Sequence, residues 1–433
     1  MPARSARDRL EEALARIADR GGEGARACLT IYQQTARIAA DASDARAHAG
    51  MPLGPLDGAI VSIKDLFDVA GEPTRAGSKV LADAPPALVD APIVQRLRAA
   101  GGVIVAKTNM SEFAFSGVGA NPHYGTPGNP ADRARVPGGS SSGAAVAAAD
   151  GMCEIAIGTD TGGSTRIPAA LCGIVGFKPS QWRVPTQGAF PLSFTLDSIG
   201  PMARTVADCV RADAVMAGEE LAPAEPLGLA GLRLGIPQGL PLRDFDAIVA
   251  SRFSAATSAL GKAGVRLSDE PLDDFFDAMQ QINAKGGFAP AEAYSIHRER
   301  LATRAADYDP NVRARIERGR ELSAAEYVAM VRERANLVRA MDARLSDLDG
   351  WVLPTTPIVA PTIAEISTCE TFSAKNLLLL RNTAIGNFFD LCAISLPLPR
   401  DAGLPVGLML VARNGQDQRL FRIAAAVERL FAA

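Results

Sequence analysis

The sequence predicts an α/β protein with a mixed, mainly parallel central sheet surrounded by helices. Short apolar and β-branched runs such as GAIVSIKDLFDV (58–69) and VIVAK (103–107) are typical of buried strands. The segment between them, APIVQRLRAAGG (91–102), has helical character, and strands that alternate with helices indicate an α/β sheet. A chain of 433 residues, 48% of them hydrophobic, can bury a large core, and we expect a single domain over residues 1–433.

The order of patterns along the chain divides this expected domain into sections. Leu10, Leu14 and Ile17 recur at helical spacing among charged residues, which predicts N-terminal helices. Apolar runs near the other end, WVLPTTP (351–357) and VGLMLVA (406–412), predict a return to the sheet. The expected sections are the N-terminal helices, a core of strands and loops, a charge-rich helical section and the C-terminal return, over residues 1–50, 50–215, 220–350 and 350–433.

Composition and charge exclude several classes of partner. The 45 basic and 48 acidic residues leave a net charge of −3, so no strong field attracts nucleic acid or an anionic membrane. No apolar run is long enough to span a bilayer, and the first residues lack the apolar core of a signal peptide. We therefore expect a cytoplasmic protein whose partner is a small molecule. The sequence leaves open whether it forms a homodimer.

Histidines are scarce in this chain. Only His48, His123 and His297 occur, and none has the spacing of a metal ligand pair. We expect no metal and no cofactor, and histidine-based acid–base catalysis has few candidates.

Two glycine- and serine-rich runs, PGGSSSG (137–143) and TDTGGS (159–164), flank strand-like apolar sequence. That sequence, with AAVAAA (144–149) and EIAIGT (154–159), is too apolar for a flexible linker. Abundant glycine between buried elements indicates that the backbone approaches another group closely or adopts positive φ.

The second of these runs predicts a nucleophile beside its own oxyanion hole. A serine hydroxyl needs a base to take its proton, and the oxyanion formed by its attack needs preorganised N–H donors. The paired glycines let successive main-chain N–H groups converge on one point without interference from Cβ atoms. The predicted donors are Thr161, Gly162, Gly163 and Ser164, and Ser164 is the predicted nucleophile.

Lys64 is the best candidate for the base. It follows the strand-like AIVSI, and burial disfavours an ammonium and lowers its pKa from about 10.4. The alternative is a lysine on an edge strand that points to water. The residue pattern alone leaves both open.

A different nucleophile is offered by GSSSG (139–143), which fits the G-x-S-x-G pattern of an α/β-hydrolase esterase with Ser141 as nucleophile. That enzyme needs a downstream histidine, and the only one is His297, in the charged sequence SIHRERLATR, which predicts an exposed helix face. No strand is predicted immediately before Ser141. A further alternative is a scaffold in which the Gly-Ser segment binds peptides without catalysis.

Seven motifs follow one another along the chain: GAIVSIKD (58–65), KTNMSEF (107–113), GNPADRARVPGGSSSGAAVAAA (128–149), GTDTGGSTRIPAALCGIVGFKP (158–179), PTQG (185–188), LDSIGPMART (196–205) and GLPVGLML (403–410). With them the chain resembles the amidase signature family of serine amidohydrolases. The resemblance is strong over residues 50–215 and looser over the C-terminal part.

The resemblance implies the amidase-signature fold and a Ser-cisSer-Lys triad. Ser164 is then the nucleophile, Lys64 the base, and Ser140, which lies 24 residues before Ser164, the bridging serine on a cis peptide bond. A small carboxamide would be cleaved to carboxylate and ammonia through an acyl-enzyme, without metal or cofactor. Ser141 and Arg166 match motif positions and are expected to support the site or bind substrate, although Arg166 equally fits a structural clamp.

The resemblance leaves the substrate open. It implies a pocket lined by residues 220–350 together with the 117–130 and 370–390 loops. A carboxylate-bearing monoamide, a biuret-type compound and an arylacetamide all fit the pattern. An alternative is a glutaminase-type subunit of a tRNA amidotransferase complex, which would need partner chains.

Overall fold

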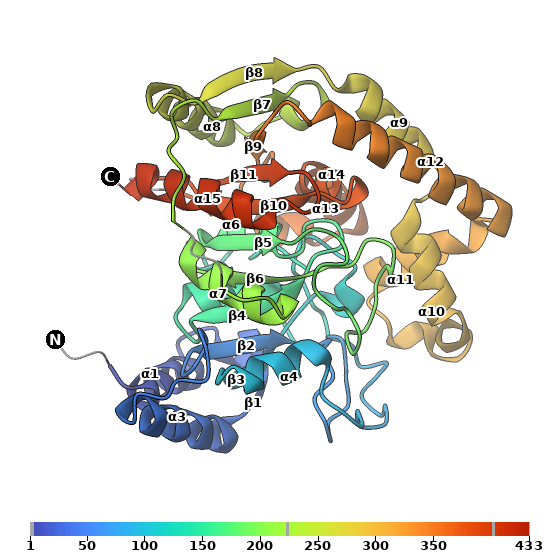
Figure 1. The fold of residues 1–433 in the computed structure, drawn as a ribbon. Coiled ribbons are helices and arrows are strands. Elements are labelled where there is room, and N and C mark those ends of the chain that lie inside the picture. The colour runs from blue at the N-terminus through green and yellow to red at the C-terminus, as the bar shows by residue number, and fades with distance from the viewer. Residues whose placement is uncertain (1–3, 222–224, 401–402, 433) are drawn as a thin grey trace.

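One central sheet of eleven strands runs through the molecule. The computed structural model describes residues 4–221, 225–400 and 403–432. The strands lie in the order β1-β3-β2-β4-β6-β5-β10-β11-β9-β7-β8, so that the N-terminal and C-terminal parts of the chain meet between β5 and β10 (Figure 1). They are β1 (Cys28–Ile31), β2 (Ile60–Lys64), β3 (Val103–Thr108), β4 (Ile155–Thr159), β5 (Val175–Lys178), β6 (Ile199–Ala203), β7 (Arg233–Pro237), β8 (Arg266–Glu270), β9 (Gly350–Pro354), β10 (Cys392–Pro397) and β11 (Gly407–Ala412).

The sheet is mixed, as predicted, but its parallel pairs are confined to two blocks. Strands β3, β2 and β4 are parallel neighbours, and so are β9, β7 and β8. The other six pairs between the described strands are antiparallel. The expectation of mainly parallel strands therefore needs correction. Parallel neighbours require a crossover connection, and the helices over residues 92–99 and 247–262 provide it between β2 and β3 and between β7 and β8.

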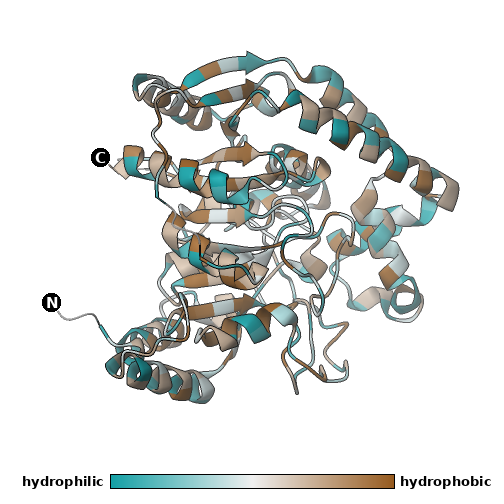
Figure 2. Ribbon diagram, viewed as in Figure 1, coloured by the Kyte–Doolittle hydropathy of each residue, from teal (hydrophilic) through white to brown (hydrophobic). Residues whose placement is uncertain are grey.

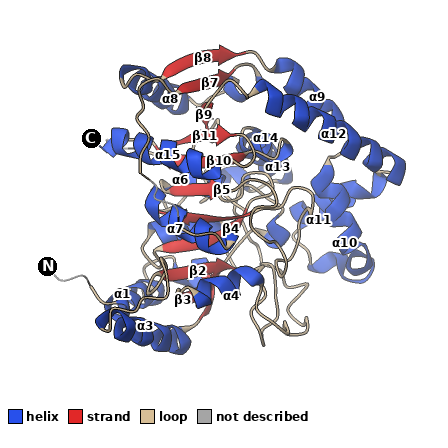
Figure 3. Ribbon diagram, in the orientation of Figure 1, coloured by secondary structure: helices blue, strands red, loops and turns tan. Residues whose placement is uncertain are grey.

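Helices cover both faces of the sheet (Figure 3). Helices α1, α3, α5 and α6 share a hydrophobic cluster on one face, and α4, α7, α8 and α15 contribute to the cluster on the other. The helices are α1 (Ala6–Ala18), α2 (Gly24–Ala27), α3 (Gln33–His48), α4 (Pro92–Ala99), α5 (Ser142–Ala149), α6 (Arg166–Cys172), α7 (Val206–Ala217), α8 (Ala247–Lys262), α9 (Asp273–Asn283), α10 (Phe288–Arg304), α11 (Pro310–Glu317), α12 (Ala324–Arg344), α13 (Cys369–Arg381), α14 (Thr383–Phe388) and α15 (Asp417–Ala432).

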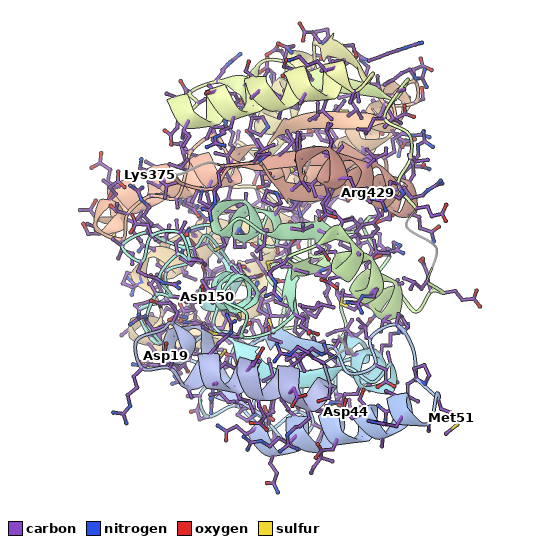
Figure 4. All side chains as sticks on the ribbon, turned by 90° about the vertical axis from the view of Figure 1, so that its left-hand side faces the viewer. Asp19, Asp44, Met51, Asp150, Lys375 and Arg429 are labelled. Atoms are coloured by element: carbon purple, nitrogen blue, oxygen red, sulfur yellow. The ribbon has the colours of Figure 1, made fainter. Side chains whose placement is uncertain are left out.

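The N-terminal helices form where the apolar spacing predicts them. Leu10 and Ile17 are buried on the inner side of α1. The Asp44 carboxylate on α3 accepts hydrogen bonds from the backbone N–H groups of Ala6 and Arg7, which satisfies donors that the first turn of α1 leaves open. Figure 4 shows α1 and α3 side by side at this edge of the molecule, with Asp44 labelled.

The AAVAAA run corrects the expectation of strand-like sequence at 144–149, because it forms the helix α5. Alanine has the highest helix propensity of all residues, and a helix that is apolar on every side is stable only when it is buried. Helix α5 is buried over residues 142–148 and contacts β2, β3 and β4. Figure 2 shows hydrophobic residues along most of the central strands, whereas the helices at the rim alternate hydrophobic and hydrophilic residues.

Helices α9 to α12 form an arc along one side of the sheet (Figure 1). The loops of the N-terminal half gather on the same side, facing α10 and α11 (Figure 3). Across the part of the chain that is described, no helix combines the length and the apolar character needed to cross a membrane.

Candidate active site

Lys64 lies in the interior of the protein, at the last position of β2. That strand pairs with β3 on one side and β4 on the other, and the Lys64 side chain is fully buried. Its Nζ donates hydrogen bonds of 2.8 Å to Ser140 Oγ and of 2.8 Å to Thr159 Oγ1. The alternative of an edge-strand lysine that points to water is therefore wrong.

Burial lowers the pKa of Lys64 to about 7, although the negative charges of Asp197 and Asp160 oppose this shift. A substantial fraction of the side chain is thus a neutral amine near neutral pH. A neutral amine within hydrogen-bond distance of a hydroxyl can accept its proton. The pair formed by Lys64 and Ser140 has the geometry of a base and its first proton donor.

Ser140 lies between Lys64 and the loop that carries Ser164. The Gly139–Ser140 peptide bond is cis, and the Ser140 side chain is fully buried. The next residue, Ser141, donates its backbone N–H to the carbonyl oxygen of Ser164 at 3.3 Å, which joins the two loops. Within the described contacts, the Ser140 and Ser164 hydroxyls form no hydrogen bond with each other. Catalytic hydrogen bonds of this kind often tighten only in the substrate complex.

The turn before Ser164 needs glycine at Gly163. This residue has a φ of +134°, and a Cβ atom there would lie 2.1 Å from Thr383 Oγ1. The Gly163 N–H donates to Asp160 Oδ1 at 2.8 Å, so this predicted oxyanion donor already has an intramolecular acceptor. The other three predicted donors have no acceptor among the described residues, and all three of their residues line a cavity.

A buried ion pair between Asp160 and Arg166 supports this turn. Arg166 donates to the Asp160 carboxylate through Nε at 3.0 Å and through Nη2 at 2.8 Å. It also donates to the carbonyl oxygen of Thr383 and to Asn387 Oδ1, and its side chain is fully buried. Burial alone would raise the pKa of Asp160, but the Arg166 guanidinium holds it well below its usual range. This is the geometry of a structural clamp and not of a substrate contact.

Sequence reasoning missed three polar residues of the site: Thr159, Asp160 and Asp197. Asp197 accepts a hydrogen bond of 2.5 Å from Thr161 Oγ1, and burial raises its pKa to about 6. A signal was present for two of them, because Asp160 directly follows a buried strand and Asp197 lies inside the LDSIGPMART motif. Acids in apolar surroundings are rarely buried without partners.

A cavity of about 320 Å³ opens beside Ser164. Such a volume fits a small molecule. The lining includes positions from each of the three expected segments and also from 114–116 and 192–196, which were not expected. Most of the lining side chains are apolar, among them Leu196, Met279, Phe288, Leu380 and Phe388.

The esterase alternative fails on geometry. Ser141 is buried, and its hydroxyl donates to the carbonyl oxygen of Thr159 at 3.4 Å. The charged sequence context of His297 predicted an exposed helix face, and this prediction is wrong. His297 is buried on α10, where Nδ1 lies 3.0 Å from the Tyr308 hydroxyl and the ring packs on Phe113. Burial lowers the pKa of His297 to about 4. No contact between Ser141 and His297 occurs among the described residues.

The described residues also include no group of three or more His, Cys, Asp or Glu side chains arranged to hold a metal ion.

Comparisons with known proteins show the family of this chain. Residues 8–421 match the Amidase family. A 2-amino-5-chloromuconic acid deaminase from Comamonas testosteroni is 40% identical over 405 residues, which cover 91% of this chain and 86% of that protein. A glutamyl-tRNA(Gln) amidotransferase subunit from Anaeromyxobacter sp. (strain K) is 36% identical, with 98% and 93% covered. A 1-carboxybiuret hydrolase subunit from Pseudomonas sp. (strain ADP) is 35% identical, with 98% and 95% covered.

Solved structures show the same fold. A crystal structure of an amidase superposes with a TM-score of 0.88 at 32% identity and covers 99% of this chain and 96% of that one. The peptide amidase from Stenotrophomonas maltophilia gives a TM-score of 0.80 at 28% identity, with 99% and 94% covered. Fold and relatives together define a hydrolase that acts on carbon–nitrogen bonds. The chain belongs to the amidase signature family, and a non-catalytic peptide-binding scaffold does not fit that membership.

Proposed function

We propose that this protein hydrolyses a small carboxamide to a carboxylate and ammonia through an acyl-enzyme on Ser164. The observation that carries the proposal is the fully buried Lys64, whose pKa is lowered by burial to about 7 and whose Nζ lies 2.8 Å from Ser140 Oγ. Similarity to a deaminase, to one chain of an amidotransferase and to a carboxybiuret hydrolase subunit supports an amide-type carbon–nitrogen bond and does not rank the substrates.

In the proposed mechanism, neutral Lys64 takes the proton of Ser140 while Ser140 takes the proton of Ser164. The Ser164 oxygen attacks the amide carbon, and the free N–H groups of the turn bind the oxyanion. When the C–N bond breaks, the relay returns the proton to the leaving nitrogen, which departs as ammonia. Water then attacks the ester, again giving its proton to the relay, and the acid leaves as Ser164 is regenerated.

The test is a screen of small amides for ammonia release by the wild type and by the variants Ser164→Ala, Ser140→Ala and Lys64→Ala. We expect each variant to lose activity by roughly 1000-fold or more, since members of a proton relay act as a unit. Circular dichroism melts show whether the variants are folded. A phosphonofluoridate probe should add its mass to the peptide that contains Ser164. Near-normal kcat in folded Lys64→Ala would reject the mechanism.

A second candidate, a glutaminase-type subunit of an amidotransferase, is supported by the similarity to the glutamyl-tRNA(Gln) amidotransferase chain over 98% of this protein. It predicts that glutamine is the preferred amide and that activity requires partner chains. Ammonia release from glutamine, compared with release from simple amides by the isolated chain, separates the two candidates.

A further inference from the structure

Arg315, on α11, is an arginine without an acidic partner in the wall of the cavity. Both Arg315 and Arg318 line the cavity, as does Ser164. Among the described residues no carboxylate pairs with Arg315 and no acceptor receives a hydrogen bond from it. Its Nε is buried and unsatisfied. A buried donor of a charged group without a partner costs free energy, which indicates that the partner comes from outside the chain.

The Arg315 guanidinium is held in place by an aromatic ring. Its central carbon lies 4.6 Å from the centre of the Phe115 ring, and Phe115 lines the same cavity. A guanidinium that lies over a ring face keeps its N–H donors at its edge, where they match the two oxygens of a planar anion. The side chain is therefore oriented before any ligand binds.

The cavity also lacks negative charge. None of the described residues that line it is an aspartate or glutamate. Burial, and then the nearby positive charge of Arg318, lowers the pKa of Arg315 to about 10, and the side chain still carries its charge at neutral pH. A ligand ammonium would meet two arginines and no carboxylate, so the cavity favours an anion and disfavours a zwitterion.

We propose that Arg315 binds a carboxylate of the substrate, and that the substrate class is therefore amides that carry a second, anionic end and no ammonium group. The inference rests on the proposed function, because it places the amide at Ser164 and the anion at Arg315 in the same cavity. Monoamides of dicarboxylic acids meet both requirements. Glutamine does not, since its α-ammonium finds no acidic partner there.

The kinetic test compares the monoamides of succinic, glutaric and adipic acid with uncharged straight-chain amides of equal length and with glutamine. We expect the best monoamide to exceed its uncharged counterpart and glutamine by about 100-fold in kcat/KM. Arg315→Gln should remove this preference by lowering kcat/KM for the monoamide about 100-fold, while the rate with the uncharged amide stays within about threefold. Arg315→Lys should restore part of the loss, since it keeps the charge.

Arg313→Gln is the matched control, because Arg313 lies on the same helix and does not line the cavity. Its Nε is also buried without a hydrogen bond, but it has an acidic partner, Glu317 Oε1 at 3.7 Å, and its Nη1 donates to the carbonyl oxygen of Ala305. Arg313→Gln should leave kcat/KM unchanged for both the monoamide and the uncharged amide. The proposal is overturned if the wild type shows no preference for any monoamide, or if Arg315→Gln slows charged and uncharged amides equally, as a merely structural residue would.

A binding experiment separates this inference from the proposed function. Calorimetry with Ser164→Ala measures the affinity for each monoamide without turnover. We expect Ser164→Ala to bind a monoamide more tightly than its uncharged counterpart. In the double variant with Ser164→Ala and Arg315→Gln, the affinity for the monoamide should fall about 100-fold. This result supports the anion site even if the wild type releases no ammonia. Equal binding of both ligands rejects the anion site even if the protein proves to be an amidase.

Discussion

Lowering the pH should stop catalysis in step with the protonation of Lys64. Burial sets the pKa of this side chain to about 7, against an ordinary value of about 10.4. Only the neutral amine can accept the proton of Ser140, so kcat/KM should follow the neutral fraction. That fraction is about one half at pH 7 and about one tenth at pH 6. The expected loss between the alkaline plateau and pH 6 is therefore roughly 10-fold, and below pH 6 the loss becomes less steep, because Asp197, with a pKa of about 6, is protonated and no longer favours the ammonium.

The charge of Asp197 gives a second way to shift the acid limb of the pH profile, which is the pH range in which kcat/KM rises with pH. Of the two carboxylates that raise the pKa of Lys64, Asp197 has the larger effect. Asp197→Asn removes that charge while an amide oxygen can still accept from Thr161, so the limb should shift to lower pH. The assay is ammonia release at low substrate concentration from about pH 5 to pH 9 at constant ionic strength, with circular dichroism at each pH as the control for folding. A flat profile, or a limb that moves upward in Asp197→Asn, would refute the reasoning.

The same pKa has a consequence for stability. The pKa of Lys64 is lower in the folded than in the unfolded chain, so the unfolded chain binds more protons between about pH 7 and about pH 10.4. The contribution of Lys64 to the free energy of unfolding therefore rises with pH across this window.

Two substitutions test the support of the nucleophile turn. Gly163→Ala should lower the free energy of unfolding in urea by about 2–4 kcal/mol, because the new Cβ would lie 2.1 Å from Thr383 Oγ1 at a φ of +134°. A loss well below about 1 kcal/mol would show that the turn relaxes. Arg166→Met should cost about 3–5 kcal/mol, because it leaves the Asp160 carboxylate buried without its cation. Adding Asp160→Asn should recover part of that loss, and a double variant with fully additive losses would contradict the coupling.

The parts of the site that could be predicted lie in short, local patterns. A lysine at the end of an apolar run predicts the end of a buried strand, and Gly-Gly-Ser predicts a turn with converging N–H groups. The strands that carry both features form where expected. The LDSIGPMART motif marks the segment that contains Asp197 but not the role of its side chain, because the hydrogen bond to Thr161 joins residues 36 positions apart. Arg315 is one of many arginines in a charge-rich helical section, and only the fold separates it from those in water.

Contacts between distant segments also explain why the prediction for His297 was wrong. His297 has a charged sequence neighbourhood, but Phe113 and Tyr308, from other segments, enclose its ring. No pattern predicted the strands β5, β6 and β8, because glycine, proline or charged residues interrupt their apolar runs, VGFK, IGPMA and RLSDE. The antiparallel pairs that join the two parallel blocks depend on strand order, which no local pattern encodes.

The arrangement of the site along the chain bears on how such a protein diverges. The lysine, both serines and the clamp come from residues 64–166, whereas much of the cavity wall comes from 279–318 and 377–388. Replacing side chains in the second group should change which molecule is admitted and leave the proposed catalytic residues intact. A library confined to α11 and the start of α10 would sample new selectivities at little risk to the nucleophile, and descendants of one ancestral enzyme can come to use different compounds by the same route.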